Sequence, residues 1–94
     1  MARVARLTPR FRRSLPSFGI VPGSARWRAL MSTIRGLSRA DALPGHADFL
    51  TEFHPGHAQV RRVAGHNLWV LYRFDTIHLE VLAVRDTPPV PVDE

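Results

Sequence analysis

The chain has 94 residues, of which 45% are hydrophobic and 22% are charged, and it contains no cysteine. This composition predicts one folded domain, which we place at residues 1–86, followed by a proline-rich extended tail at 87–94. It excludes disulfides and thiolate metal sites, and no apolar run approaches the roughly 20 residues that span a bilayer. We expect no secretory signal at the basic N-terminus, so the sequence predicts a cytoplasmic protein with no membrane partner.

The positive charge of the chain is unevenly distributed. All 13 basic residues are arginines, and nine of them fall within residues 1–40, which contain no acid. Residues 41–94 contain four arginines against eight acids. A half this basic favours a polyanion or an acidic protein as its partner. The alternative is a solvated arginine-rich face that the acidic half partly neutralises.

The N-terminal half predicts a short strand followed by two helices. The strand covers 2–7, and Thr8 and Pro9 are typical of the N-cap and first position of a helix. After a glycine- and proline-containing loop, Ser24 is the expected cap of a second helix over 25–37. Apolar residues recur at helical spacing in both segments, so each helix has one apolar face. We therefore expect an antiparallel helical hairpin that packs on a sheet.

The C-terminal half predicts that sheet. A short edge strand is expected over 49–53, and a basic strand over 58–64. The stretch 68–74 is apolar at nearly every position, which is typical of a central strand covered on both faces. The last strand, 77–85, alternates, and its expected core face comprises Ile77, Leu79, Val81 and Ala83. The fold class is therefore α+β, with an N-terminal strand and a two-helix hairpin packed on a small antiparallel sheet.

Arginines at the strand ends are the main candidates for function. Arg61 and Arg62 are adjacent in the basic strand, so their side chains should point to opposite faces of the sheet. Arg85 ends the last strand, and His66 lies in the turn after the basic strand. Neighbouring antiparallel strands begin and end at the same rim, so Arg62, Arg85 and the His66 turn can meet there. Two converging guanidinium groups are suited to clamp a phosphate.

Histidines outside this rim are less informative. His54 and His57 flank a Pro-Gly turn, and a metal site there would need further ligands from His46, Asp48 or His66. Two histidines with unspecified partners are a weak zinc signature, so exposed turn histidines are the favoured interpretation. We predict no metal and no cofactor, and the roles of His46, His54 and His57 stay open.

One run of motifs resembles a known family. A basic strand V-R-R-V at 60–63 is followed by Gly65, an apolar strand at 68–74 that contains L-Y-R, and a strand at 77–85 that ends in V-R. This order resembles the RelE/ParE-type toxins of bacterial type II toxin–antitoxin pairs. The resemblance implies a RelE/ParE-like fold and a toxin that an acidic cognate antitoxin holds inactive. It also implies one of two activities, a ribosome-dependent mRNA endonuclease (an mRNA interferase) or a non-enzymatic inhibitor of DNA gyrase.

The endonuclease is the activity that we favour from the sequence. Arginine can stabilise the charge that develops on a phosphate during RNA cleavage, and histidine can transfer protons near neutral pH. The expected catalytic set is Arg62, Arg85, His66 and Tyr72, and the expected RNA contacts are Arg61, Arg73, Arg12 and Arg13. Trp69 stands where many such nucleases carry an arginine, which favours the gyrase alternative. A third possibility is a basic RNA-binding module without catalysis.

Overall fold

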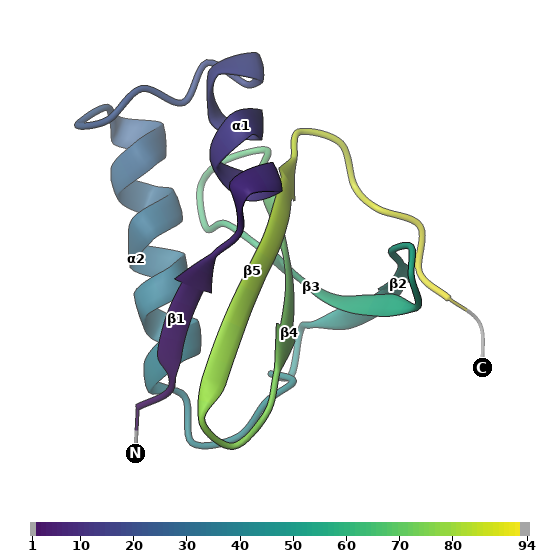
Figure 1. Ribbon diagram of the computed structural model, residues 1–94. Coiled ribbons are helices and arrows are strands. Elements are labelled where there is room, and N and C mark those ends of the chain that lie inside the picture. The colour runs from purple at the N-terminus through teal and green to yellow at the C-terminus, as the bar shows by residue number, and fades with distance from the viewer. Residues whose placement is uncertain (1, 93–94) are drawn as a thin grey trace.

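The computed structural model describes residues 2–92, which form two helices and five strands in an α+β arrangement (Figure 1). The predicted α+β class is therefore confirmed. In chain order the elements are β1 (Val4–Leu7), α1 (Pro9–Ser17), α2 (Ala25–Arg39), β2 (Phe49–Glu52), β3 (His57–Arg62), β4 (Trp69–Phe74) and β5 (His78–Arg85).

The strands form a mixed sheet in the order β1-β5-β4-β3-β2. The pairs β2–β3, β3–β4 and β4–β5 are antiparallel, whereas β1 runs parallel to β5. The prediction of an antiparallel sheet is thus wrong at this edge. Short turns oblige consecutive strands to run in opposite directions, but most of the chain separates β1 from β5. No local turn therefore fixes the direction of that pair, and the sequence pattern does not reveal it.

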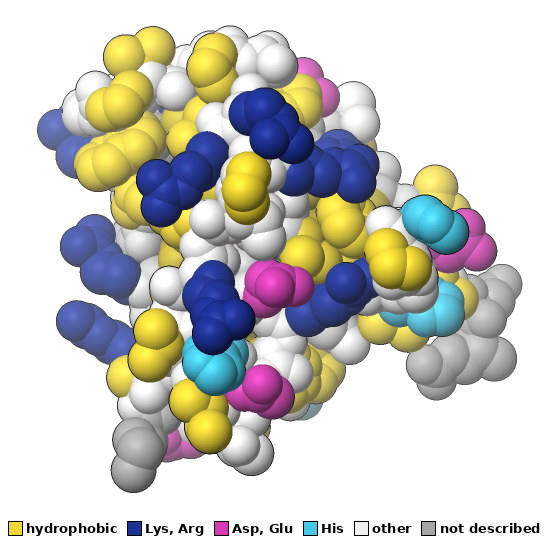
Figure 2. Space-filling view, viewed as in Figure 1, with side chains coloured by type: hydrophobic (Ala, Val, Ile, Leu, Met, Phe, Trp, Pro, Cys, Tyr) yellow, Lys and Arg dark blue, Asp and Glu magenta, His cyan; other side chains and the backbone are white. Residues whose placement is uncertain are grey.

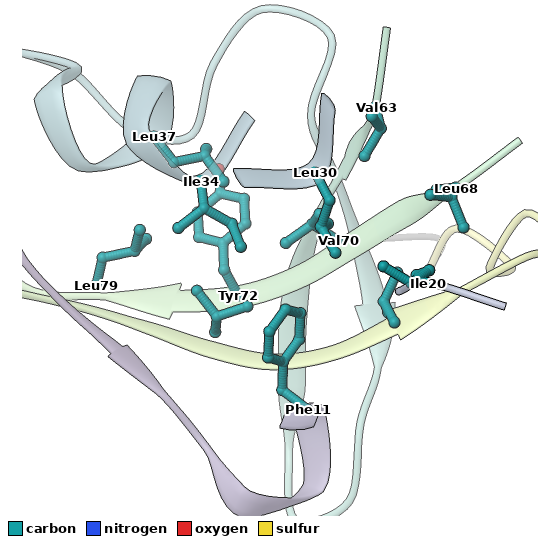
Figure 3. Packing of buried hydrophobic residues seen from close by; sticks show 12 residues of the cluster. Phe11, Ile20, Leu30, Ile34, Leu37, Val63, Leu68, Val70, Tyr72 and Leu79 are labelled. Carbon is teal, nitrogen blue, oxygen red and sulfur yellow. The ribbon is translucent and has the colours of Figure 1, made fainter. Parts of the chain in front are cut away.

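Both helices contribute to one buried cluster on one side of the sheet, which we call the helix face (Figure 3). Phe11 of α1 and Leu30 of α2 meet Val70 and Tyr72 of β4 there, and all four are fully buried. A second cluster lies on the opposite side, which we call the far face and define by Val60, Leu71 and Ala83. The prediction that the central strand is covered on both faces is therefore confirmed.

A β-bulge in β5 changes which side chains share a face. Tyr72 pairs with Val81 and Leu71 pairs with Ala83, so Leu82 has no partner in the register. Val81 packs in the cluster of the helix face, whereas Ala83 packs on the far face. The predicted common face is therefore wrong for Ala83, because one extra residue reverses the alternation. It is also wrong for Ile77, which precedes the strand and is 61% exposed.

The C-terminal tail pairs with the sheet through β2. The Val92 amide donates to the Leu50 carbonyl at 2.8 Å, and the Thr51 hydroxyl donates to the Val90 carbonyl at 2.8 Å. Figure 1 shows this yellow segment leaving the end of β5 and crossing to β2. The sequence predicts an extended arm over 87–94. Residues 90–92 of this arm lie along β2, and residues 93–94 lie outside the described range.

Thr8 connects the start of α1 to β5, and we predict an unusually large effect for a helix cap. Its hydroxyl accepts from the Phe11 amide at 3.2 Å and donates to the carbonyls of Val81 and Leu82, at 3.0 and 3.1 Å. Thr8→Val should lower the free energy of unfolding by about 2 kcal/mol, because a cap and a tertiary hydrogen bond are lost together.

Ser24 provides the matched control, because its hydroxyl caps α2 through the Trp27 amide alone. Ser24→Ala should lower the free energy of unfolding by about 1 kcal/mol. Urea denaturation followed by circular dichroism measures both variants. Equal losses would show that the bonds from Thr8 to β5 contribute nothing.

Candidate functional site

Three side chains form a row across the far face, one from each of three neighbouring strands. Arg62 of β3 pairs with Trp69 of β4, and Trp69 pairs with Arg85 of β5. The Arg62 guanidinium lies over the Trp69 ring, 5.7 Å from its centroid, which is a cation–π contact. The bulge at Leu82 is what brings Arg85 to this face. Arg62 and Arg85 thus lie on the same face of the sheet, as predicted, and Trp69 lies between them.

Arg10 adds a further positive charge near Arg85. It lies in the first turn of α1, which runs beside the second half of β5. Its guanidinium stands 4.5 Å from the centroid of Phe53, a residue of the far-face cluster. Burial lowers the pKa of Arg85, and the positive charge of Arg10 lowers it further. Both influences disfavour the charged form of Arg85, so an anion next to Arg85 would favour that form.

Tyr72 does not join this row. It points to the helix face, where it is fully buried and donates a hydrogen bond to Asp48 (Figure 3). Burial raises the pKa of Tyr72, and the neighbouring Asp48 carboxylate raises it further. A phenol enclosed in this way cannot contact a substrate on the far face. The structure therefore separates Tyr72 from Arg62 and Arg85, with which it was predicted to act.

Two of the arginines predicted to contact RNA are engaged by the protein itself. Arg61 points to the helix face and holds Asp48 with two hydrogen bonds, at 2.7 and 2.9 Å. Arg73 donates to the backbone carbonyls of Phe53, Pro55 and His57. These contacts fix the loop before β2 and the turn between β2 and β3. The guanidinium groups of Arg61 and Arg73 are therefore engaged in contacts within the protein.

Of the other residues predicted to act in the site, His66 lies near the row, whereas Arg12 and Arg13 lie apart from it. His66 sits in the turn between β3 and β4, where its amide donates to the Val63 carbonyl. Arg62 reaches the same turn through a long contact, 3.5 Å, with the Asn67 amide oxygen. Arg12 and Arg13 are exposed on α1, in a region where Figure 2 shows dark-blue arginine side chains gathered over both helices.

The sequence did not single out Asp48 as a structural centre or Arg10 as part of the site. Asp48 carries a weak signal, because Gly45 and Asp48 form a turn in which the Gly45 amide donates to the carboxylate. Arg10 carries none, since its role depends on how α1 meets the edge of β5. His46, His54 and His57 are exposed, and among residues 2–92 no three His, Asp or Glu side chains converge as metal ligands. Within the same range, no helix has the length and apolarity needed to cross a membrane.

Comparison of the chain with protein-family models, curated proteins and solved structures gives no match. A function is therefore inferred from the geometry of the far face.

Proposed function

We propose that this protein is the toxin of a type II toxin–antitoxin pair of the RelE/ParE type, and that its target is mRNA. The observation that carries the proposal is the far-face row of Arg62, Trp69 and Arg85, with the positive charge of Arg10 near Arg85. Unpaired RNA presents phosphates for arginines and base faces for an aromatic ring. A row that alternates cation, indole and cation matches both features.

Cleavage of the bound strand is the activity that we assign to this row. The RNA 2′-hydroxyl loses its proton and attacks the adjacent phosphorus, a new P–O bond forms, and the bond to the 5′-oxygen breaks. Arg62 and Arg85 would stabilise the negative charge that develops on the phosphate oxygens. His66, in the turn next to Arg62, would take the proton from the 2′-hydroxyl and give it to the departing 5′-oxygen near neutral pH.

The expected partners follow from the charge distribution. The arginine-rich first 40 residues offer a surface for an acidic antitoxin, and Figure 2 shows arginine side chains along α2 as well as α1. The ribosome would present mRNA to the far face, and the protein would act in the cytoplasm.

The proposal predicts that expression of the protein alone arrests growth and truncates translated mRNAs. Arg62→Ala combined with Arg85→Ala should abolish both effects, because the row loses its two phosphate-binding groups. Arg35→Ala combined with Arg39→Ala is the matched control, since it removes the same charge from exposed positions on α2. Colony counts and mapping of mRNA 5′ ends are the measurements. Toxicity that survives the first pair, or an equal loss in both pairs, would contradict the assignment.

The second candidate function is non-enzymatic inhibition of DNA gyrase. The enclosed Tyr72 favours it, because it leaves the far face without the predicted phenol. Growth arrest with DNA-damage signalling and intact mRNA would support this candidate. An RNA-binding module without catalysis would instead show salt-dependent RNA affinity and no toxicity.

A further inference from the structure

A cavity of about 580 Å³ lies between the C-terminal tail and the far face. This volume falls within the range of about 300–1,000 Å³ that is typical of small-ligand sites. Residues 89–92 of the tail form one wall, and Thr51 and Glu52 of β2 form another. Leu71 and Arg85 complete the lining, so the cavity adjoins the far-face row through Arg85.

The tail wall is held to the sheet. Thr51 is 5% exposed, its hydroxyl bonds the Val90 carbonyl, and it forms an antiparallel bridge with Pro91. The amide of Val92 adds a hydrogen bond to Leu50 of β2. These contacts span the tail from residue 90 to residue 92. The cavity is therefore built from two segments that the fold holds together.

The lining combines apolar surfaces with one cation and one anion. Leu71 belongs to the far-face cluster, and the rings of Pro89 and Pro91 add rigid apolar surface. Arg85 supplies the positive charge, while Glu52 on the exposed edge can accept hydrogen bonds from ring N–H or amino groups. A ligand that suits this lining has an apolar ring face, polar ring edges and a negative group near Arg85.

We propose that the cavity takes one unpaired nucleobase of the bound RNA, with the phosphate of that nucleotide on Arg85. The inference rests on the proposed function and adds a base-binding site to it. Arg85 belongs both to the cavity and to the row, and Trp69 stands next to it. A single strand could thus place one base on the indole and the neighbouring base in the cavity. The carboxylates of an acidic peptide could pair with Arg85, but they offer no ring to pack against the apolar part of the cavity lining.

Nuclear magnetic resonance titration of the full chain tests this inference. The probes are the four ribonucleoside 5′-monophosphates, with ribose 5-phosphate, inorganic phosphate and hexaglutamate as comparisons. At least one nucleotide should shift the backbone amides of Leu71, Val90 and Val92. It should bind at least about fivefold more tightly than ribose 5-phosphate, which is the lower end of what stacking one base contributes. Equal affinity for ribose 5-phosphate, or stronger shifts with hexaglutamate, would overturn the inference.

Two variants that each introduce a negative charge, one in the cavity wall and one outside it, provide a matched pair. Val90 lines the cavity and is 79% exposed, and Val21, in the loop between the helices, is 61% exposed. Val90→Asp should weaken nucleotide binding at least about fivefold, because the carboxylate repels the phosphate and disfavours burial of the ring. Val21→Asp should leave the binding unchanged, and an equal loss in both variants would contradict a site under the tail.

Thr51→Val tests whether the tail is a wall of the binding site or merely covers Arg85. The substitution removes the hydroxyl that holds Val90 while keeping the shape of the side chain. If the tail is a wall of the site, nucleotide affinity falls. An unchanged affinity would mean that the tail is not a wall of the site, and a rise would mean that the tail obstructs Arg85. The inference would be wrong in either case.

The inference and the proposed function fail in different ways. If single-stranded oligoribonucleotides bind the chain and shift the Trp69 indole, but no nucleotide shifts Leu71 or Val90, only the base site is lost. If no oligoribonucleotide binds and expression leaves growth unaffected, the proposed function itself is wrong.

Discussion

Asp48→Ala should lower the free energy of unfolding by about 3 kcal/mol, the largest effect that we expect from one polar residue. Its side chain is fully enclosed, and it accepts hydrogen bonds from Arg61, Tyr72 and the Gly45 amide. Breaking a buried ion pair typically costs about 3–5 kcal/mol, because it leaves the partner charge uncompensated. We take the lower end, since the Arg61 side chain is 27% exposed and can regain water.

Urea denaturation at neutral pH measures this loss, and Tyr72→Phe is the matched partial variant. It removes a single hydrogen bond to Asp48 and keeps the ring in the core, so it should cost about 1 kcal/mol. If Asp48→Ala costs no more than Tyr72→Phe, the Arg61–Asp48 pair contributes nothing measurable.

The same carboxylate predicts a pH dependence. Burial alone would raise the pKa of Asp48, but the hydrogen bonds from Arg61, Tyr72 and Gly45 and the charge of Arg61 outweigh it. The pKa in the folded chain therefore lies below its ordinary value of 3.8. A depressed pKa gives stability that is present above the unfolded-state value and lost as the pH falls through the folded-state value. The difference in unfolding free energy between wild type and Asp48→Asn should accordingly shrink below about pH 4. A difference that stays constant down to about pH 2.5 would contradict this role.

Gly45→Ala should lower the free energy of unfolding by about 2 kcal/mol through the same contacts. A Cβ at residue 45 would lie 2.0 Å from Nη2 of Arg61 and 3.3 Å from Oδ2 of Asp48. Because Asp48 holds both Nε and Nη2 of Arg61, the guanidinium cannot move aside without losing these hydrogen bonds. A hydrogen bond to a charged group contributes about 1.5–3 kcal/mol. Thermal and urea unfolding both measure the change.

Gly36→Ala is the matched control, and it should act in the opposite direction. Gly36 lies within α2 and is exposed, and a Cβ at this residue would meet no neighbouring atom within 4 Å. Alanine there should raise the free energy of unfolding by about 0.5–1 kcal/mol, because it restricts the unfolded chain and favours the helix. If Gly45→Ala lowers the free energy of unfolding and Gly36→Ala raises it, the loss at Gly45 is due to crowding of the Arg61 guanidinium.

Local features of the fold were predictable because local chemistry determines them. Thr8 and Ser24 cap the two helices as predicted, through hydrogen bonds to the Phe11 and Trp27 amides. The adjacent arginines of β3 do point to opposite faces, since alternation in a strand is a backbone property. The parallel pairing of β1 was not predictable, because it joins segments far apart in the chain. The bulge at Leu82 was not predictable either, because residues 81–84 are all apolar and do not show where the alternation reverses.

The candidate site was predictable only in part, for a related reason. Arg62 and Arg85 could be inferred from their places at strand ends, and the row contains both. Tyr72 could not be separated from them, because an apolar strand covered on both faces does not reveal which face meets the helices. Asp48 gives Tyr72 and Arg61 a shared acceptor from a loop whose course the sequence does not determine.

Leu82, which has no partner in β4, divides β5 into two halves. Between these halves the even- and odd-numbered residues exchange faces. Before it, the far face takes the even-numbered positions, including Glu80 opposite Arg73. After it, the far face takes the odd-numbered positions Ala83 and Arg85. The first half of β5 pairs with both β1 and β4, and the second half, which pairs with β4, carries Arg85 of the row. The effects of substitutions along β5 should therefore follow the pattern of two short strands, and the residues that face the helices in one strand are offset by one position in the other.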